Sequence, residues 1–311
     1  GYMFEVDVII PVYKPAEKFI KLLEQLRKQT IQIHKIILIN TEKQYFDRLT
    51  EGIDFWKKYD NVQVKHISKA EFDHGKTRNY GVSLSKAPYF IMMTDDAVPV
   101  DEKLVEKLLK PFEDEEVGMS YAKQLPGKNS DPIESYTRTF NYPDTPLVKS
   151  RKDLGHMGIK TFFASDVCAA YRRVTFDKLG GFPDCAIFNE DMIYARGLID
   201  AGYKIFYAAE AGVEHFHSYN GRGQFKRNFD MGVSHADHPE VFSGLSTESE
   251  GIRLVKKTCT YLCKIGKPHL IIKLFWLSGC KYLGYFLGKR YKHFPRKWIK
   301  VFSMNKNYWE K

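Results

Sequence analysis

The sequence is poor in cysteine, and its cysteines lack the spacing of a metal site or of a disulfide framework. Only Cys259 and Cys263 lie close together, at a helical spacing rather than that of a zinc ribbon. An odd number of thiols without a paired pattern is typical of reduced, mostly buried side chains in a reducing compartment. The five residues are Cys168, Cys185, Cys259, Cys263 and Cys280.

The sequence also shows no pattern typical of a targeting segment or of a membrane-spanning helix. Gly1 to Glu5 leads directly into a strand-like segment, without the basic and apolar stretches of a secretory signal, so we expect a cytoplasmic protein. No uncharged run reaches the roughly 18 apolar residues that cross a bilayer, and we expect no integral membrane helix. With 43% hydrophobic residues among 311, the chain can still bury a substantial core.

Acidic residues are almost absent from the C-terminal segment 251–311. This segment holds 15 Lys and Arg residues and the single acid Glu310, so the basicity of the chain, net +10, belongs to it. Apolar residues between Leu270 and Leu287 favour a surface-lying helix on acidic membrane headgroups. The alternative is a helical hairpin that packs on the rest of the chain or forms a homodimer. We expect no nucleic acid, because aliphatic runs interleave the charges.

Strand-like and helix-like patterns alternate in the first third of the chain. This alternation predicts right-handed βαβ units, a mostly parallel sheet and an α/β fold. The apolar runs are Val6 to Val12, Lys35 to Ile39, Val62 to Ile67 and Tyr89 to Met93, and the periodic stretches are Ala16 to Gln29, Gln44 to Lys58 and Lys76 to Ser85.

Beyond residue 125 the regular pattern weakens. Pro126 to Lys160 is rich in Pro, Gly, Asn, Asp and Ser, which predicts a long loop region that shapes an acceptor site. Short helices are then predicted at Arg173 to Leu179 and Asp191 to Ala201, and a strand at Tyr203 to Ala208.

Polar residues follow the predicted strands where a parallel sheet binds its ligand, at the carboxyl ends of the strands. They are Tyr13 and Lys14, Asn40 and Thr41, and Asp95 and Asp96.

Three pairs of residues carry candidate chemistry. Asp95 and Asp96 at a strand tip suit Mg²⁺ or Mn²⁺ on a diphosphate, although such pairs also make turns or cap a following helix. Glu190 and Asp191 suit a general base, or else an acidic helix start that complements the helix dipole. His215 and His217 point to one side of an extended segment and suit a metal, although a lone histidine is more often a hydrogen-bonded core residue.

Five motifs, in this order, carry a resemblance to a known family. They resemble those of the family 2 glycosyltransferases with the GT-A fold, and within that family the bacterial rhamnosyltransferases most of all; the resemblance covers nearly the whole chain. The motifs are Val-Ile-Ile-Pro-Val-Tyr (8–13), Phe-Asp-His-Gly-Lys-Thr-Arg-Asn (72–79), Met-Thr-Asp-Asp-Ala-Val-Pro (93–99), Phe-Asn-Glu-Asp (188–191) and Val-Glu-His-Phe-His-Ser-Tyr (213–219).

The resemblance implies roles for the residues at matching positions. It implies that Asp96 binds Mg²⁺ or Mn²⁺ on the donor diphosphate together with His215 and His217, and that Asp191 is the general base, with Glu190 beside it. The remaining matching positions are implied to bind the donor nucleotide: Pro11, Val12, Tyr13, Asn40, Asp73, His74, Lys76, Arg78 and Asp95.

From these observations we expect a GT-A catalytic domain at 1–250, a Rossmann-like α/β fold, and a basic helical tail at 251–311. The expected reaction is metal-dependent, inverting transfer of L-rhamnose from dTDP-rhamnose to a lipid-linked or growing cell-surface polysaccharide, at the inner face of the membrane. The alternatives are another donor, a UDP-hexose or an aminosugar nucleotide, and a non-catalytic glycan-binding module on the same fold.

Overall fold

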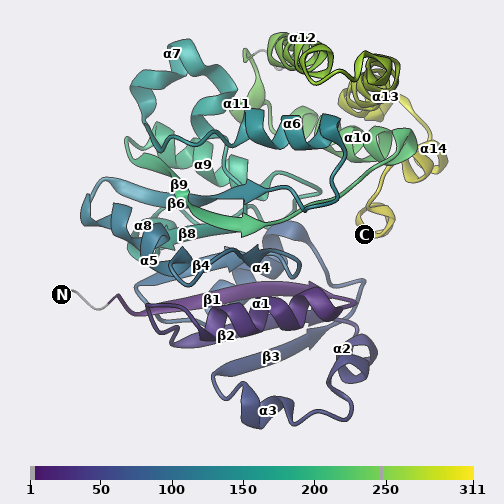
Figure 1. Cartoon of the computed structure of the whole chain (residues 1–311). Helices are drawn as coiled ribbons and strands as arrows, with labels where there is room; N and C mark the ends of the chain where they lie inside the picture. The colour runs from purple at the N-terminus through teal and green to yellow at the C-terminus, as the bar shows by residue number, and fades with distance from the viewer. Residues whose placement is uncertain (1–3, 246–247) are drawn as a thin grey trace.

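A nine-stranded sheet forms the centre of the computed structural model, which describes residues 4–245 and 248–311 (Figure 1). The strands are β1 (Val6–Tyr13), β2 (Lys35–Thr41), β3 (Val62–Ile67), β4 (Tyr89–Met93), β5 (Val98–Pro99), β6 (Val117–Leu125), β7 (Leu147–Lys149), β8 (Cys168–Arg172) and β9 (Lys204–Glu214).

Helices cover both faces of this sheet and form the C-terminal part of the chain. The α-helices are α1 (Glu17–Arg27), α2 (Lys43–Thr50), α3 (Phe55–Lys58), α4 (His74–Ser83), α5 (Leu104–Leu109), α6 (Pro132–Asn141), α7 (Leu154–Met157), α8 (Arg173–Lys178), α9 (Glu190–Asp200), α10 (Gly221–Asp237), α11 (Pro239–Phe242), α12 (Glu248–Lys264), α13 (Ile271–Lys289) and α14 (Arg296–Phe302). The 3₁₀ helices are η1 (Lys110–Glu113), η2 (Arg151–Asp153), η3 (Gly158–Phe162), η4 (Pro268–Leu270), η5 (Tyr291–His293) and η6 (Lys306–Glu310).

The sheet is parallel in its first half and mixed in its second. Its strand order is β3-β2-β1-β4-β8-β6-β9-β5, with β7 also on β9. The four predicted strands are confirmed as the parallel half. Beyond β4, the pairs β4–β8, β6–β8, β5–β9 and β7–β9 are antiparallel, and only β6–β9 is parallel. The prediction of a mostly parallel sheet therefore holds only for the part of the chain in which apolar runs alternate with helical stretches.

Alternate residues of the strands feed two separate cores. In β1, Val8 and Ile10 pack with α1 and α5 on one face, whereas Ile9 packs with α4, α8 and α9 on the other. Both faces are covered, which explains why β1, apart from the buried Asp7, is largely apolar rather than alternating with polar residues.

The prediction of a loop at 126–160 is wrong, because this segment contains α6, β7, α7, the 3₁₀ helix η2 and the start of η3. The Asp131 carboxylate accepts a hydrogen bond from the Ile133 N–H at 2.7 Å, and Pro132 occupies the first turn, so the Asp-Pro pair starts a helix. The predicted elements at Arg173, Asp191 and Tyr203 are confirmed as α8, α9 and β9.

All five cysteines are free, as predicted, but only Cys168 is buried. The expectation of mostly buried thiols is wrong because Cys185 lies in an exposed loop and Cys263 on the solvent side of α12.

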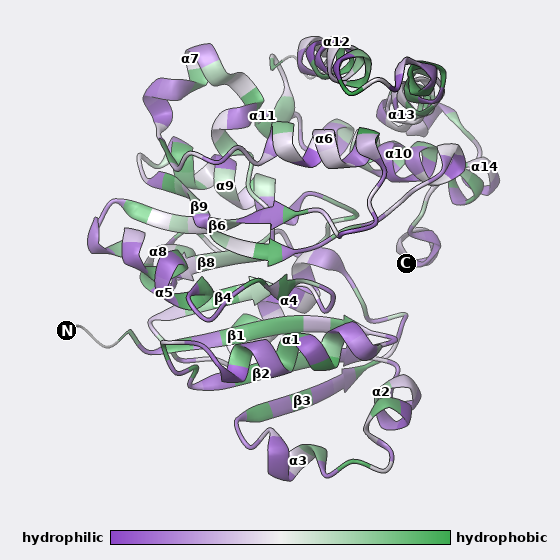
Figure 2. Cartoon of the chain, viewed as in Figure 1, coloured by the Kyte–Doolittle hydropathy of each residue, from purple (hydrophilic) through white to green (hydrophobic). Residues whose placement is uncertain are grey.

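The C-terminal helices stack on α10 and α6 at one end of the sheet (Figure 1). Figure 2 shows hydrophobic residues along α13. By length and composition, the stretch Pro268–Lys289 is long and apolar enough to cross a membrane, in contrast to the sequence-based expectation. The end of the chain returns to the N-terminal half, where the Lys311 ammonium donates a hydrogen bond to the Phe72 carbonyl at 2.6 Å.

Candidate active site

The topology brings distant segments to one edge of the sheet. In Figure 1 the arrowheads of β1, β6 and β9 point to the same side. Asp95 and Asp96 follow β4, and Asp166 precedes β8, whose Cys168 pairs with Met93 of β4. His215 follows Glu214 of β9, which pairs with Leu125 at the end of β6. The predicted site residues therefore converge because adjacent strands end together.

Asp96, His215 and His217 form the first cluster. The Asp96 carboxylate lies 3.3 Å from Nε2 of His215 and 2.7 Å from Nε2 of His217. Burial opposes the charge of Asp96, but hydrogen bonds from both imidazoles overcome it and lower the pKa of Asp96 below its ordinary value. The candidate ligand atoms all lie within 4.8 Å of one another. One carboxylate and two imidazoles at this separation fit a divalent cation.

The two histidines differ in their surroundings. The His215 ring is buried, and burial lowers its pKa, which favours the neutral form that binds metal. Its Nδ1 atom has no hydrogen-bond partner among the described residues. His217 is half exposed and stacks on Tyr219, with ring centroids 5.8 Å apart. Thus one imidazole is fixed inside the protein and the other is accessible to solvent.

Asp95 joins this cluster to the end of β1. Its carboxylate accepts a hydrogen bond from the Tyr13 backbone N–H at 3.0 Å. Burial raises the pKa of Asp95 to about 6. The exposed Tyr13 ring packs edge-on against Tyr45, 5.9 Å away, and the Lys14 ammonium lies 5.2 Å from the Tyr13 ring. This is the crevice between β1 and β4, where the strand order reverses and α/β sheets bind nucleotides.

Asp166, Glu190 and Asp191 form a second cluster with ligand atoms within 4.8 Å. The Arg78 guanidinium lies between them, with Nε 3.3 Å from Glu190 and 3.8 Å from Asp166. The side chains of Arg78, Asp166 and Glu190 are all buried, whereas Asp191 is partly exposed. One permanent cation therefore faces three carboxylates.

The Asp191 carboxylate is held by backbone N–H groups. It accepts hydrogen bonds from Asp166 and from Met192, both at 2.8 Å. Burial and the charge of Glu190 raise the pKa of Asp191 to about 7. The preceding Asn189 has a positive φ of 63°, a conformation that asparagine tolerates, and this turn presents Asp191 at the start of α9. An oriented carboxylate with this pKa can remove a proton near neutral pH.

A polar chain connects the two clusters. Arg138 of α6 hydrogen-bonds Gln124 of β6, and the Gln124 amide donates to Ser165 at 3.1 Å, next to Asp166. The charge of Arg138 acts on His215, and Gln124 also donates to the Tyr142 hydroxyl at 2.7 Å. Both clusters therefore belong to one polar site.

Several predicted donor-binding residues have other partners. The Asp73 carboxylate caps α4 and accepts from the N–H groups of Gly75, Lys76 and Ala186, and its contact with the donor stays a prediction. Arg78 is buried in the second cluster rather than free for a diphosphate.

The structure places the remaining predicted residues as follows. Asn40 is fully buried and donates to Glu42 and His66, and the Val12 side chain is in the core. The Asn40 Oδ1 atom has no hydrogen-bond partner among the described residues, and the contacts of Asn40 and Val12 with the nucleotide stay predictions. His74 is partly exposed 3.9 Å from Glu190, while Lys76 is exposed and Pro11 half-buried.

The sequence interpretation missed Asp166, Gln124, Arg138 and Tyr45. No motif marks Asp166, although its position just before a buried strand could have suggested a strand-end acid. Arg138 was missed because α6 was taken for loop. Tyr45 lies one turn into α2, and only the fold brings it to Tyr13.

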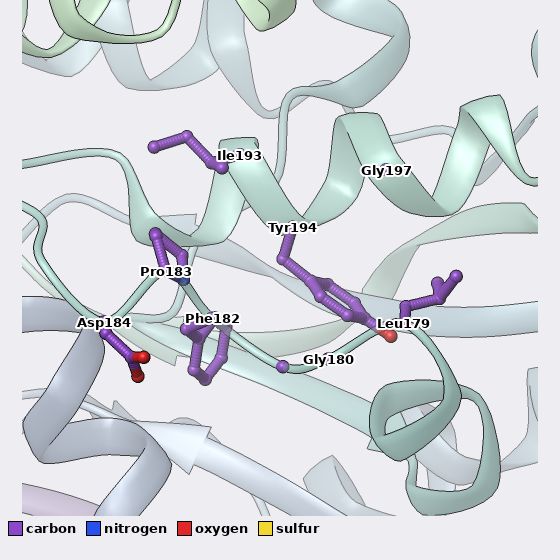
Figure 3. A pocket seen from close by; sticks show the side chains of 9 residues that line it. Leu179, Gly180, Phe182, Pro183, Asp184, Ile193, Tyr194 and Gly197 are labelled. Carbon is purple, nitrogen blue, oxygen red and sulfur yellow. The ribbon is translucent and has the colours of Figure 1, made fainter.

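A separate hollow of about 400 Å³ lies between α9 and the loop after α8 (Figure 3). Its lining includes Gly180, Phe182 and Tyr194 and none of the predicted site residues. Without carboxylate clusters or imidazoles in its lining, this hollow has none of the chemistry described above.

Residues 7–180 match the family model for glycosyl transferase family 2. The chain belongs to this family. The glycosyltransferase is 36% identical to the O-antigen chain rhamnosyltransferase RfbN of Salmonella typhimurium, over 98% of this chain and 96% of the relative. It is 37% identical to the O-antigen chain rhamnosyltransferase WbaN of Salmonella anatum, over 97% of this chain and 95% of the relative.

Solved structures confirm the predicted GT-A fold of this glycosyltransferase. The mannosyltransferase PcManGT from Pyrobaculum calidifontis, in complex with GDP-Man and Mn²⁺, superposes with a TM-score of 0.57 at 12% identity, over 99% of this chain and 86% of that one. The S. aureus TarS fragment 1–349 superposes with a TM-score of 0.52 at 11% identity, over 93% of this chain and 91% of that one.

Proposed function

We propose that this glycosyltransferase transfers L-rhamnose from dTDP-rhamnose to a growing cell-surface polysaccharide, with inversion and with a divalent metal. The sugar is supported by RfbN and WbaN, both named O-antigen chain rhamnosyltransferases and similar over nearly their whole length. The observation that carries the reaction is the meeting of two clusters at one sheet edge, one suited to a cation and the other to a base.

Asp96, His215 and His217 would hold the metal. When bound, it supplies the positive charge that neutralises a leaving diphosphate. Two imidazoles beside one carboxylate favour Mn²⁺ over Mg²⁺, since Mg²⁺ prefers an all-oxygen shell. The similarity to PcManGT, solved with Mn²⁺, agrees with this assignment.

Asp191 would be the base that takes the proton from the acceptor hydroxyl. Its two backbone hydrogen bonds fix the carboxylate, and its partial exposure leaves it open to an acceptor. Glu190 stands beside it as a positioning residue through Arg78. Direct displacement needs one base and no covalent enzyme intermediate.

The donor nucleotide would occupy the crevice between β1 and β4. The exposed Tyr13 ring and the partly exposed Tyr45 ring offer a stacking surface for the base, and Lys14 adds positive charge toward the phosphates. The Tyr13 backbone N–H is already bonded to Asp95, which fixes the floor of this crevice.

The acceptor would be a lipid-linked glycan, and the enzyme would act at the inner face of the cell membrane. Residues 1–250 would form the catalytic unit, and the basic helices of 251–311 the part that meets lipid or, in a homodimer, a second subunit. This segment holds 15 Lys and Arg residues and the single acid Glu310, and this excess of positive charge supports the choice of an acidic partner.

A donor panel tests the sugar. With purified enzyme, Mn²⁺ and one acceptor, dTDP-rhamnose should give faster transfer than UDP-glucose, UDP-galactose or UDP-N-acetylglucosamine. A clear preference for a UDP-sugar would refute the donor assignment while leaving the reaction class intact.

The variant Asp191→Asn tests the base. Asparagine can still accept one of the two backbone hydrogen bonds, so the variant should keep nucleotide binding while transfer falls roughly 10²- to 10³-fold. Unchanged turnover would remove Asp191 as the base. Retained nucleotide binding with no transfer in the wild type would favour the non-catalytic module instead.

A further inference from the structure

Helix α13 has apolar residues on two opposite faces. Its buried residues, Leu274, Leu277, Gly284 and Gly288, recur at helical spacing and form one face. The opposite face is also apolar but exposed, with Ile272 80% and Trp276 67% accessible. We call this exposed face the apolar strip; its residues are Ile272, Phe275, Trp276, Tyr282, Leu283 and Phe286. A helix with two apolar faces needs two apolar neighbours.

The buried face is fixed on α10 by glycines. A Cβ atom on Gly284 would lie 2.2 Å from the Phe225 carbonyl oxygen, and one on Gly288 would lie 2.1 Å from that of Phe229. Only glycine allows two helices to approach this closely. Lys273 of α13 also pairs with Asp131 of α6. A helix held this way lies along the protein, and crossing a bilayer would break these contacts.

The strip is bordered by positive charge. The Arg290 guanidinium lies 3.6 Å from the Phe286 ring centroid, at the end of the strip. Lys264 and Lys267 lie exposed before the other end. The segment 251–311 holds 15 basic residues and one acid. A second copy of this surface would repel the first, whereas an anionic lipid surface complements it.

The strip begins beside the active site. A Cβ atom on Gly221, the first residue of α10, would lie 2.6 Å from Nε1 of Trp276. His217 lies four residues before Gly221 and stacks on Tyr219. Whatever covers the Trp276 end of the strip therefore lies against the start of α10, four residues after His217 of the first cluster.

We propose that the apolar strip of α13 lies in the plane of an anionic bilayer, with its apolar side chains among the acyl chains and the surrounding Lys and Arg on phosphate headgroups. The bilayer thereby holds the active-site opening close to the membrane surface. The lipid contact deepens the membrane location given under the proposed function, and the consequence that a lipid-linked acceptor reaches the site from this side rests on that function.

Vesicle binding tests the contact. Wild-type protein should sediment with vesicles of equal parts phosphatidylglycerol and phosphatidylcholine, and much less with phosphatidylcholine alone or at high salt. The variant Ile272→Ser/Phe275→Ser/Leu283→Ser should bind the anionic vesicles roughly tenfold more weakly or worse, because each exposed side chain contributes apolar area. Val174→Ser, a 74% exposed residue on α8, is the matched control and should bind as wild type.

Tryptophan quenching locates the contact on the protein. Brominated anionic lipids should quench part of the fluorescence of the wild type, and Trp276→Phe should lose most of that quenching. Trp56→Phe, 54% exposed on α3, should retain it. Equal quenching in both variants, or equal vesicle binding by the triple variant, would overturn the proposal.

Two further outcomes would also overturn it. A concentration-dependent dimer that the triple variant abolishes would identify a second copy as the occupant, and retention in membranes after alkaline carbonate extraction would identify a spanning helix. Transfer to a soluble acceptor glycan is measured in parallel. The triple variant should keep that rate, so a loss of lipid binding and a failure of the proposed reaction remain distinguishable.

Discussion

Two charged clusters meet at the same edge of the sheet, and they differ in what balances their carboxylates. In each, three candidate ligand atoms lie within 4.8 Å. Asp96 faces two imidazoles, which can release their protons and bind a metal instead. Asp166 and Glu190 face Arg78, which always keeps its charge. The first cluster can therefore exchange protons for an external cation, whereas the second already contains its cation.

The balance of charge also explains why the second cluster suits proton transfer. One guanidinium cannot compensate three carboxylates, and burial together with neighbouring carboxylates raises the pKa of both Asp166 and Asp191. Such interacting groups share protons as a unit. Asp191 is the member of the cluster that is partly exposed, so it is the one that can receive a proton from a substrate.

Removing the carboxylate of the first cluster should give the largest effect. In Asp96→Ala the two imidazoles remain without their anionic partner, so Mn²⁺ binding should be lost and transfer should fall roughly 10³-fold. Isothermal titration with Mn²⁺ and a transfer assay measure the two quantities. Asp60→Ala, an exposed acid after α3, is the control. Wild-type Mn²⁺ binding in Asp96→Ala would break the contrast between the clusters.

Removing the cation of the second cluster should act on stability instead. Arg78→Met leaves Asp166 and Glu190 buried without a counter-charge, and the free energy of unfolding should fall by about 3 kcal/mol. Urea denaturation measures this change, and the exposed Arg48→Met should change it little. Adding Asp166→Asn removes one uncompensated carboxylate and should restore part of the loss. No recovery in the double variant would show that the charges are not coupled.

The sequence was sufficient for the parallel half of the fold and for the strand-end carboxylates. The runs of β1, β2 and β4 are buried on both faces, so their apolar patterns are nearly continuous and easily found, whereas the edge strand β3 is partly exposed. Asp96, His215 and Asp191 were found because strand ends and motif order mark them. Helix α6 was missed because polar residues and a proline dominate its sequence, although Asp131 and Pro132 form a helix start.

The ion-pair partners of the site residues, by contrast, could not be predicted from residue type. Arg78 has the side chain of a phosphate ligand, but its neighbours in space are Glu190 and Asp166, which lie about a hundred residues later. Asp166 has no motif, and its importance arises only when β8 is placed antiparallel beside β4. Side chains at strand ends are brought together by topology, and single-sequence patterns do not contain the order of strands.

Asp73 is a carboxylate that belongs to neither cluster, and it provides a reference for the comparison between them. It accepts hydrogen bonds from Gly75, Lys76 and Ala186, so Asp73→Ala should lower the free energy of unfolding by about 2 kcal/mol. The KM for the donor should change little, since both oxygens already accept backbone hydrogen bonds. Asp73→Asn keeps one acceptor oxygen and should lose less stability. A large rise in KM without a loss of stability would return Asp73 to the donor site.

The smallest expected effect is a shift of the pH profile, and it tests the second cluster most directly. Asp191 removes a proton only when ionised, so transfer at saturating substrate should rise with pH through an apparent pKa near 7. Glu190→Gln removes the like charge that helps to raise the pKa of Asp191, and the acidic limb should move to lower pH by about one unit or less, equivalent to about 1.4 kcal/mol. The control is Glu102→Gln, an exposed carboxylate before α5, which should leave the limb unchanged. If Glu190→Gln moved the limb to higher pH, Glu190 would be stabilising the ionised form through Arg78 rather than opposing it, and the charge balance inferred for this cluster would be wrong.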